Sequence, residues 1–270
     1  MVLLKSYIKN NIEYIIFAIL LIILIYLLAK RSIDYFYTEQ HGINRLDAII
    51  YINLENRDDR KTLLLKELET LNTNMSKVHK VSGLYIPKNG HKGCVQAHIL
   101  AFNMIKLNNW KRVLILEDDA QLSITPDIFN NVINQTLDHL DSLDNYPLDN
   151  NNTNWDVIML ASANKILNDK ITQYNKILKT PTPIQLEKII SATTSSAYII
   201  KNTYVDKLLN LFTMCNNNMR PDKLSSNKHE PYALDQQWFN LQTQDNWYAL
   251  SPDPIKQREI WSTILKESHA

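Results

Sequence analysis

Apolar residues are first concentrated in one unbroken run near the amino terminus. Residues 12–29 read IEYIIFAILLIILIYLLA, with Glu13 as the single charge. Eighteen helical residues rise about 27 Å, which matches the core of a thin endomembrane. A segment that is apolar on every face favours a membrane span over a buried core helix. The Lys30-Arg31 pair directly after Ala29 argues against a cleaved signal peptide, so the run predicts an uncleaved, single-pass transmembrane anchor.

Basic residues flank both ends of this predicted anchor. Lys5 and Lys9 precede it, and Lys30 and Arg31 follow it. The rule that positive charge marks the cytoplasmic side therefore leaves the orientation open between the cytosol and the lumen of the endoplasmic reticulum or Golgi. The sequence is predicted to divide into a tail at 1–11, the anchor at 12–29, a juxtamembrane linker at 30–44 and a folded domain at 45–270.

After the linker, short apolar runs alternate with amphipathic segments. Four mainly apolar runs predict strands buried on both faces, at 48–52, 113–116, 155–160 and 197–200. Helical spacing and capping residues predict helices at 58–71, 95–107, 202–211 and 233–241. This alternation predicts an α/β domain with a mostly parallel central sheet. The polar stretches 141–154 and 162–191 are predicted to be long loops.

Composition removes several classes of site. The 270 residues include 29 Lys+Arg and 28 Asp+Glu, and a net charge of +1 gives no bulk attraction to nucleic acid. The 4 glycines fit neither the G-x-G-x-x-G dinucleotide pattern nor the P-loop pattern. Cys94 and Cys215 form no C-x-x-C pair, which excludes a zinc ribbon and a thioredoxin-like site. Any phosphate is therefore bound without a glycine-rich loop.

An acidic run at the end of a predicted strand is the most informative candidate site. Glu117, Asp118 and Asp119 directly follow the strand at 113–116. Adjacent carboxylates beside a buried strand repel one another, and a hard cation such as Mg²⁺ or Mn²⁺ relieves that repulsion. Ligands of open α/β sheets bind beyond the carboxyl ends of the strands, where a cation can neutralise a diphosphate. A solvated acidic turn is the alternative interpretation.

A basic candidate follows the first predicted strand. Arg57 and Arg60 lie at the start of a predicted helix, where arginines can clamp a phosphate beside the helix amino terminus. The alternative is that these two arginines pair with neighbouring acids on a wet surface, namely Glu55, Asp58 or Asp59.

Two other segments offer one candidate each. His98 lies in the predicted helix at 95–107, where a structural histidine is the ordinary interpretation. Asp235 lies at the head of the predicted helix at 233–241. A helix cap is the ordinary explanation for such an aspartate, and a general base at a cleft mouth is the alternative.

Taken in order, these segments resemble glycosyltransferase family 25, which includes bacterial lipooligosaccharide galactosyltransferases and procollagen galactosyltransferases. The family pattern V-I-N-L-x-x-R-x-D-R is similar to YINLENRDDR at 51–60, and G-C-x-x-S-H is similar to GCVQAH at 93–98. An L-E-D-D run follows at 116–119 and a W-D-x-x-x-L strand at 155–160. Later similarities are A-Y, a D-x-x-x-F/W-like segment and a P…Q…S-x-I stretch, at 197–198, at 235–239 and at Pro252, Gln257, Ser262 and Ile264. The resemblance covers about residues 46–265.

Two segments depart from the family pattern. Ala97 replaces the serine of G-C-x-x-S-H, and Thr194-Ser195-Ser196 replaces the usual G-T-H before A-Y. These departures motivate an alternative of another class, a catalytically inactive family member that serves as a membrane-tethered binding or scaffold subunit. A metal-dependent phosphohydrolase is a third hypothesis that uses the acidic run alone, but further Asp or His ligands at motif spacing are absent from the sequence.

The resemblance implies a GT-A-like nucleotide-binding fold and a metal-dependent inverting hexosyltransferase. The donor would be a UDP-sugar with galactose as the expected hexose, and the acceptor a saccharide, a glycolipid or a hydroxylysine of a collagen-like chain. Glu117, Asp118 and Asp119 would hold Mn²⁺ or Mg²⁺. Asp235 is the expected base for the acceptor hydroxyl, with Glu230 in reserve. The residues expected at the donor nucleotide are Asn53, Arg57, Arg60, Gly93, His98 and Asp118.

Overall fold

The computed structural model describes residues 12–39, 41–144, 155–170, 172, 175–222 and 230–259. The predicted tail at 1–11 lies outside these residues, as do Ser262 and Ile264 of the late family pattern. The chain divides into two compact units, one that ends at His41 and one that begins at Gly42.

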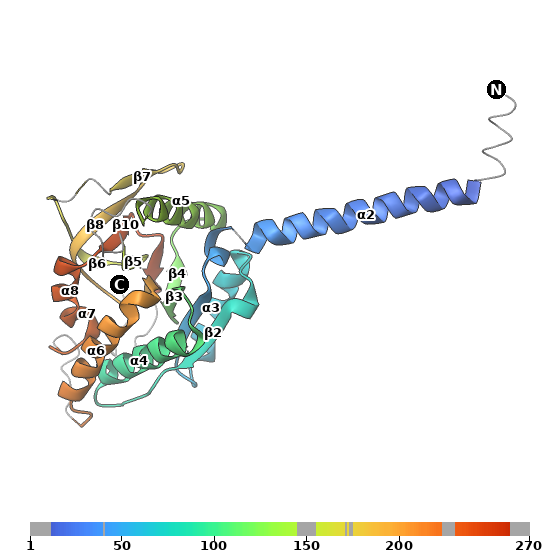
Figure 1. Cartoon of the computed structure of the whole chain (residues 1–270). Coiled ribbons are helices and arrows are strands. Elements are labelled where there is room, and N and C mark those ends of the chain that lie inside the picture. The colour runs from blue at the N-terminus through green and yellow to red at the C-terminus, as the bar shows by residue number, and fades with distance from the viewer. Residues whose placement is uncertain are drawn as a thin grey trace, which may run out of the picture. The chain divides into compact units, whose positions relative to one another are not determined.

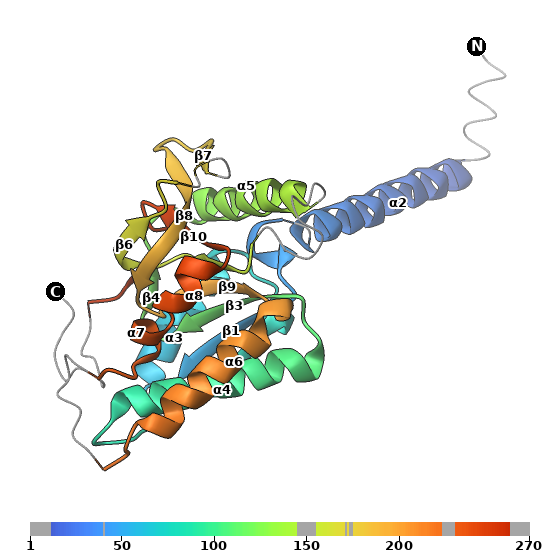
Figure 2. The same ribbon diagram turned by 60° about the vertical axis from the view of Figure 1, so that its left-hand side comes forward.

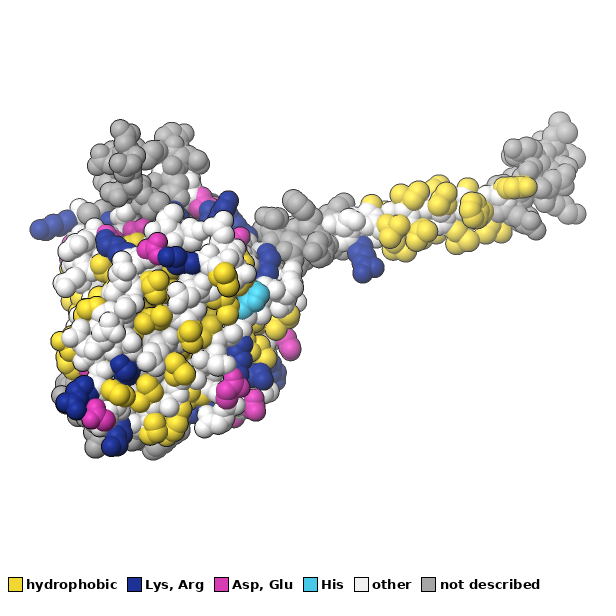
Figure 3. Space-filling view, turned by 60° about the horizontal axis from the view of Figure 1, so that its bottom comes forward, with side chains coloured by type: hydrophobic (Ala, Val, Ile, Leu, Met, Phe, Trp, Pro, Cys, Tyr) yellow, Lys and Arg dark blue, Asp and Glu magenta, His cyan; other side chains and the backbone are white. Residues whose placement is uncertain are grey.

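The amino-terminal unit contains one described helix, α2 (Ile12–Glu39). The large apolar side chains described between Ile16 and Leu28 are all exposed, as Figure 3 shows along this helix. In the part of the chain that the structure describes, no helix combines the length and the apolar character needed to cross a membrane. The anchor at 12–29 stays a prediction.

The second unit is built around a nine-stranded mixed sheet with the order β2-β1-β3-β9-β5-β10-β8-β6, in which β7 also pairs with β8 (Figures 1 and 2). β1 is parallel to β2 and β3, and β10 is parallel to β5. β9 lies antiparallel between β3 and β5, and β8 is antiparallel to β10, β6 and β7. Most strands therefore share one direction, and β8 and β9 oppose it. The strands are β1 (Ala48–Asn53), β2 (Val78–Ser82), β3 (Arg112–Glu117), β5 (Val157–Met159), β6 (Ala163–Leu167), β7 (Lys176–Leu178), β8 (Ile184–Thr193), β9 (Ala197–Lys201) and β10 (Trp247–Ser251). A two-stranded sheet pairs β4 (Ala120–Leu122) with β11 (Ile255–Gln257).

Helices cover both faces of the central sheet, and this explains why its middle strands are apolar at nearly every position. Helices α3 and α5 pack on one face with Leu114 and Leu116 of β3. Helices α4 and α6 pack on the other face with Val113 and Ile115 of the same strand. The four long helices of this unit are α3 (Asp58–Thr70), α4 (Gly90–Asn108), α5 (Pro126–Asp144) and α6 (Asn202–Asn218).

The structure confirms the predicted strands as β1, β3, β5 and β9, and it confirms three predicted helices as α3, α4 and α6. The predicted helix at 233–241 is instead two short helices, α7 (Leu234–Gln237) and α8 (Phe239–Gln244). The predicted loop at 162–191 was wrong, because that stretch contains β6, β7 and most of β8. Of the other predicted loop, 141–144 belongs to α5 and 145–154 lies outside the described residues.

The folded unit also begins earlier than the predicted boundary at residue 45. The backbone N–H of Gly42 donates to Asn134 Oδ1 at 2.8 Å, and that of Ile43 donates to Asn130 Oδ1 at 3.0 Å. Ile43 is buried in the core, and Gly42 has a φ of +55°, which favours glycine. Residues 42–44 therefore belong to the folded unit and not to the predicted linker.

Candidate active site

The carboxyl ends of β1 and β3 bring two of the predicted motifs together. The parallel register places Ile52 opposite Glu117, so Asn53 and Asp118 follow at the same edge of the sheet. Asn53 Nδ2 donates a hydrogen bond to Asp118 Oδ2 at 2.9 Å. The edge where ligands of α/β sheets bind therefore carries the acidic run.

Arg60 and Arg57 have different partners. Arg60 Nη1, from the first turn of α3, lies 2.7 Å from Asp118 Oδ1 and 3.6 Å from Asp119 Oδ2. Arg60 and both carboxylates are buried. Arg57 pairs with Asp59 at 2.9 Å, and the Asp59 side chain is 62% exposed. Arg60 thus compensates the acidic run, whereas Arg57 makes the surface pair that was the alternative interpretation.

Asp119 carries a negative charge that its neighbours compensate only in part. Burial, together with the nearby charges of Glu117 and Asp118, raises the pKa of Asp119 to about 7 against the opposing charge of Arg60. Burial likewise raises the pKa of Asp118 against the opposing effect of Arg60. Asp119 Oδ1 is buried and has no hydrogen-bond partner within the described part of the chain. An unpartnered carboxylate oxygen in an acidic, buried position fits a hard divalent cation.

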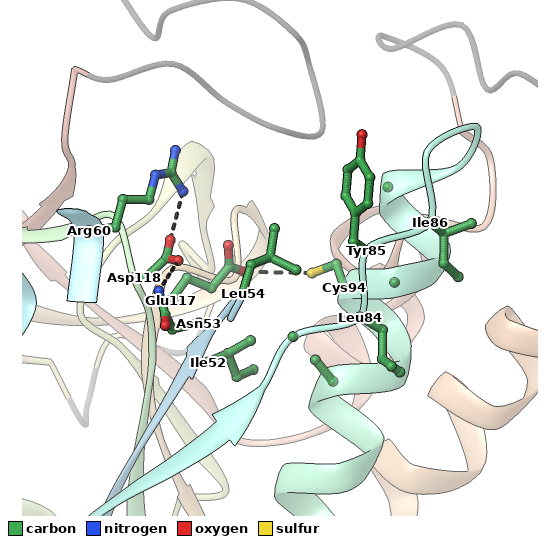
Figure 4. A pocket seen from close by; sticks show the side chains of 14 residues that line it. Ile52, Asn53, Leu54, Arg60, Leu84, Tyr85, Ile86, Cys94, Glu117 and Asp118 are labelled. Carbon is green, nitrogen blue, oxygen red and sulfur yellow. Dashed lines mark hydrogen bonds and ion pairs between the residues drawn. The ribbon is translucent and has the colours of Figure 1, made fainter. Parts of the chain in front are cut away.

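Glu117 points away from Asp118 and Asp119. Its Oε1 accepts a hydrogen bond from the Ser195 hydroxyl, and lies 3.5 Å from His98 Nε2 and 3.8 Å from Cys94 Sγ. Figure 4 shows this division, with Arg60 and Asn53 around Asp118 and Glu117 directed toward Cys94. Burial by itself raises the pKa of Glu117, but the hydrogen bond and charge of His98, together with Ser195, outweigh burial and lower it.

A pocket opens at this edge, between the end of β1 and the amino-terminal half of α4 (Figure 4). Asn53, Arg60 and Asp118 form its polar end. Apolar walls come from the segments around Leu54 and Ile86, and the ring of the exposed Tyr85 stands at the mouth in Figure 4.

Gly93 shapes this pocket through packing. A Cβ at Gly93 would lie 2.1 Å from the carbonyl oxygen of Leu84, so the absence of a side chain lets the loop before α4 lie against the helix. His98, which was predicted at the donor, is fully buried with Nδ1 2.8 Å from the Tyr198 hydroxyl oxygen. Gly93 lines the pocket and His98 does not, and their placement at a donor nucleotide stays a prediction.

Asp235 faces the segment that departs from the family pattern. Its Oδ2 accepts a hydrogen bond from the Thr194 backbone N–H at 3.1 Å, and α7 has no side-chain cap, so the ordinary explanation as a helix cap is wrong. Thr194 has a φ of +73°, which a β-branched residue rarely adopts and which favours the glycine of the usual G-T-H. Burial raises the pKa of Asp235, the charge of Glu117 adds to this rise, and the charge of His91 opposes it.

Two residues near Asp235 differ from the sequence prediction. Glu230, the predicted reserve base, accepts hydrogen bonds from Asn89 Nδ2 and from the Tyr232 backbone N–H, both at 3.3 Å. It thereby ties its own segment to the residue that caps α4. His91, which the sequence motifs did not indicate, has a buried Nε2 that finds no hydrogen-bond partner among the residues described here. The feature that could have indicated His91 is its position in the sequence, two residues before the G-C-x-x-S-H segment of α4.

Comparison with protein families decides the identity of this chain. The sequence model of glycosyltransferase family 25 (LPS biosynthesis protein) matches residues 87–225, more than half of the chain. The chain belongs to glycosyltransferase family 25. The matched range of this family 25 protein includes α4, the acidic run and Thr194–Ser196, whereas Asn53, Arg60 and Asp235 lie outside it. A search among curated proteins finds no match.

Solved structures similar to the family 25 chain share little sequence with it. A glycosyltransferase involved in the glycosylation of the major capsid of PBCV-1 is 10% identical with a TM-score of 0.37, over 76% of this chain and 92% of that one. A197 from STIV is also 10% identical with a TM-score of 0.37, over 76% and 81%. Mannose-1-phosphate geranyltransferase from Thermus thermophilus is 10% identical with a TM-score of 0.38, over 80% and 75%.

Proposed function

We propose that this glycosyltransferase moves a hexose from a UDP-sugar, with Mn²⁺ or Mg²⁺ and with inversion, to a hydroxyl group of a saccharide, a glycolipid or a hydroxylysine. The family resemblance favours galactose as the hexose. The observation that carries the proposal is the buried Oδ1 of Asp119, which has no hydrogen-bond partner among the described residues and directly follows Asp118, a residue of the pocket at the carboxyl ends of β1 and β3. It supports a cation next to a bound diphosphate.

The pocket suits a nucleotide with a flat base. Leu54, Ile86 and the ring of Tyr85 offer apolar surface that can pack against the faces of a pyrimidine. Gly90, the first residue of α4, also lines the pocket, so the positive end of the helix dipole is close to a diphosphate bound there. We propose that Asn53 and Arg60 lie at the same nucleotide, as the sequence predicted.

The cation would be held by Asp119 together with Asp118, whose carboxylates face the same buried arginine. A hard divalent cation bound there supplies charge neutralisation for the leaving diphosphate. Arg60 then balances the carboxylate charge that remains. Glu117, which was predicted as a third ligand, faces Ser195 and His98 and is omitted from this set.

We propose Asp235 as the base that takes the acceptor proton. Asp235→Asn is expected to lower kcat for UDP-sugar hydrolysis, in which water replaces the acceptor, by about 10²- to 10⁴-fold, because the asparagine amide cannot accept the proton. The Kd for UDP should change by less than about twofold, since Asp235 lies outside the nucleotide pocket.

Glu230→Gln is the matched control for this experiment, because Glu230 binds Asn89 and Tyr232. Kinetic assays measure kcat and calorimetry measures the Kd for UDP on the same protein preparations, so an effect on catalysis can be distinguished from an effect on binding. Full kcat in Asp235→Asn, or a loss confined to Glu230→Gln, would assign the base elsewhere.

The donor is tested by screening UDP-sugars for hydrolysis by the full chain with Mn²⁺ and with EDTA. The proposal expects turnover of one UDP-hexose above the others and its loss in EDTA. Absence of turnover together with absence of UDP binding would favour the scaffold hypothesis, since Ala97 and Ser195 lie in the pocket wall and beside Glu117.

We also propose that α2 attaches the catalytic unit to a membrane, because its described apolar side chains from Ile16 to Leu28 are exposed. The full chain is expected to float with phospholipid vesicles in a density gradient, and a fragment that begins at Gly42 is expected to stay at the bottom. Equal flotation of the two proteins would contradict the attachment. The fragment starts at Gly42 because Gly42 and Ile43 bond to α5.

A further inference from the structure

A second group of potential metal ligands lies on the side of the acidic run that faces α4. Cys94 and His98 are one helical turn apart on α4, which places them on the same face of the helix. Their ligand atoms and those of Glu117 all lie within 4.8 Å of one another. Among the described residues, this group does not include Asp118 or Asp119, so its ligand set differs from that of the hard-cation position proposed above.

The spacing of these three atoms is close to that of a tetrahedral site. Zn–S and Zn–N bonds of about 2.3 and 2.0 Å place neighbouring ligand atoms roughly 3.3–3.5 Å apart. Here Glu117 Oε1 lies 3.8 Å from Cys94 Sγ and 3.5 Å from His98 Nε2. The third distance, between Cys94 Sγ and the ring nitrogen of His98, is at most 4.8 Å, so rotation of the Cys94 and Glu117 side chains about their torsions can bring the three atoms to these spacings.

The surroundings also resemble those of a built metal site. The ring of His98 is oriented through Nδ1 by the Tyr198 hydroxyl at 2.8 Å, and a metal-bound histidine commonly makes a hydrogen bond through its second ring nitrogen. The Ser195 hydroxyl holds the Glu117 carboxylate. Cys94 and Glu117 line the open pocket of Figure 4, which provides a path of entry for an ion.

The charge balance favours a cation at this position. Glu117 presents its carboxylate 3.8 Å from Cys94 Sγ, and the carboxylates of Asp118 and Asp119 follow it directly in the chain. A divalent cation offsets those charges and stabilises the thiolate. On binding, the thiol proton of Cys94 and the Nε2 proton of a charged His98 are released to solvent, and the remaining Nδ1–H of His98 donates a hydrogen bond to the Tyr198 hydroxyl oxygen.

We propose that Cys94, His98 and Glu117 form a binding site for a borderline-soft divalent cation of the Zn²⁺ class. Thiolate and imidazole ligands select such ions over Mg²⁺ and Mn²⁺, which prefer all-oxygen sites. The site is independent of the proposed function, because it requires neither a UDP-sugar nor the cation at Asp119.

Cobalt is the probe for this site, because Co²⁺ bound to a thiolate gives a sulfur-to-cobalt charge-transfer absorption in the near ultraviolet. The full wild-type chain is expected to bind one equivalent of Co²⁺ with this absorption. Zn²⁺ should remove the absorption by displacement, and excess Mg²⁺ should leave it in place. The readout requires no turnover, so its failure leaves the proposed glycosyl transfer untouched.

The two cysteines of the chain supply a matched pair of variants. Cys94→Ser is expected to lose the absorption and to bind Zn²⁺ at least about 100-fold more weakly, since one of three ligands is replaced by a hydroxyl. Cys215→Ala removes the buried thiol of α6 and should keep the absorption, as should Asp119→Asn. Far-ultraviolet circular dichroism checks that each variant is folded.

The wild-type protein by itself tests the proposed cation site, even where a variant does not fold. Absence of the charge-transfer absorption in wild-type protein at excess Co²⁺ would overturn the proposal. So would its survival in folded Cys94→Ser, or its loss in folded Cys215→Ala.

Discussion

Asp119→Asn is expected to abolish UDP-sugar turnover while making the metal-free protein more stable. The variant removes the charge of the carboxylate that has an unpartnered buried oxygen. Loss of a cation ligand and of its charge is expected to lower kcat by about 10²-fold or more. A residue with a merely structural role would lose activity and stability together, so the opposite signs of the two effects identify the role of Asp119.

The stability effect has a defined dependence on pH. The pKa of Asp119 in the folded protein is raised to about 7, so folding takes up a proton and the ionised carboxylate destabilises the fold. This penalty is absent below about pH 4, grows as the pH rises, and is fully present above about pH 7, where it is on the order of a few kcal/mol. Asp119→Asn should therefore raise the free energy of unfolding more at pH 8 than at pH 5.

Urea unfolding in the presence of EDTA measures this difference. Asp58→Asn is the control, because the Asp58 side chain is 81% exposed on the neighbouring helix α3, and it should change neither turnover nor stability at either pH. Unchanged turnover in Asp119→Asn would remove this residue from the cation site. A stability gain that is equal at both pH values would contradict the titration of Asp119.

Arg60→Met is expected to destabilise the protein strongly, by about 3–5 kcal/mol, because it leaves the buried carboxylates of Asp118 and Asp119 without their compensating charge. Arg60→Lys should fall between the wild type and Arg60→Met, because it keeps the charge but loses the planar fork of the guanidinium. Chemical denaturation at pH 8 measures all three proteins.

Arg57, the other arginine of this segment, provides the comparison for this prediction. Arg57→Met breaks a pair with an exposed aspartate and should cost less than about 1 kcal/mol. Similar losses of unfolding free energy in Arg60→Met and Arg57→Met would show that burial does not increase the contribution of the Arg60 ion pair to stability.

Much of the fold could be predicted because the central strands are buried on both faces. β1 and β3 read as continuous apolar runs, and α3 and α4 follow with helical spacing. The long strand β8 was missed because it alternates buried positions with polar ones such as Gln185 and Glu187 inside a polar stretch. The direction of β9 could not be derived from its own residues. β9 continues the direction of β8 after a three-residue break, and β8 is set by its antiparallel pairing with β10.

Part of the candidate site could likewise be predicted from the sequence. Parallel strands end at one edge of a sheet, so the contact of Asn53 with Asp118 follows from the order of the motifs. The separation of Glu117 from Asp118 follows from the period of two in strands, which places Glu117 on the face of Val113 and Ile115, toward α4. The prediction of one ligand set from Glu117, Asp118 and Asp119 did not include this alternation.

The long-range partners could not be predicted from the sequence. Ser195 reaches Glu117 across 78 positions, and Asp235 binds the Thr194 backbone across 41 positions. Nothing in the neighbouring sequence indicates either contact, because both contacts depend on how β9 inserts between β3 and β5. The departure from G-T-H identified Thr194–Ser196 as an unusual segment, but it did not indicate that Glu117 and Asp235 would contact it.

Calorimetric titration of UDP into the full chain, with Mn²⁺ and then with EDTA, tests most directly whether the pocket beside Asp119 is a metal-dependent nucleotide site. The wild type is predicted to bind one UDP with Mn²⁺ and to lose at least about tenfold in affinity in EDTA, and Asp119→Asn is predicted to show no such difference. Equal UDP affinity of the wild type with Mn²⁺ and with EDTA, or no UDP binding under either condition, would contradict this account.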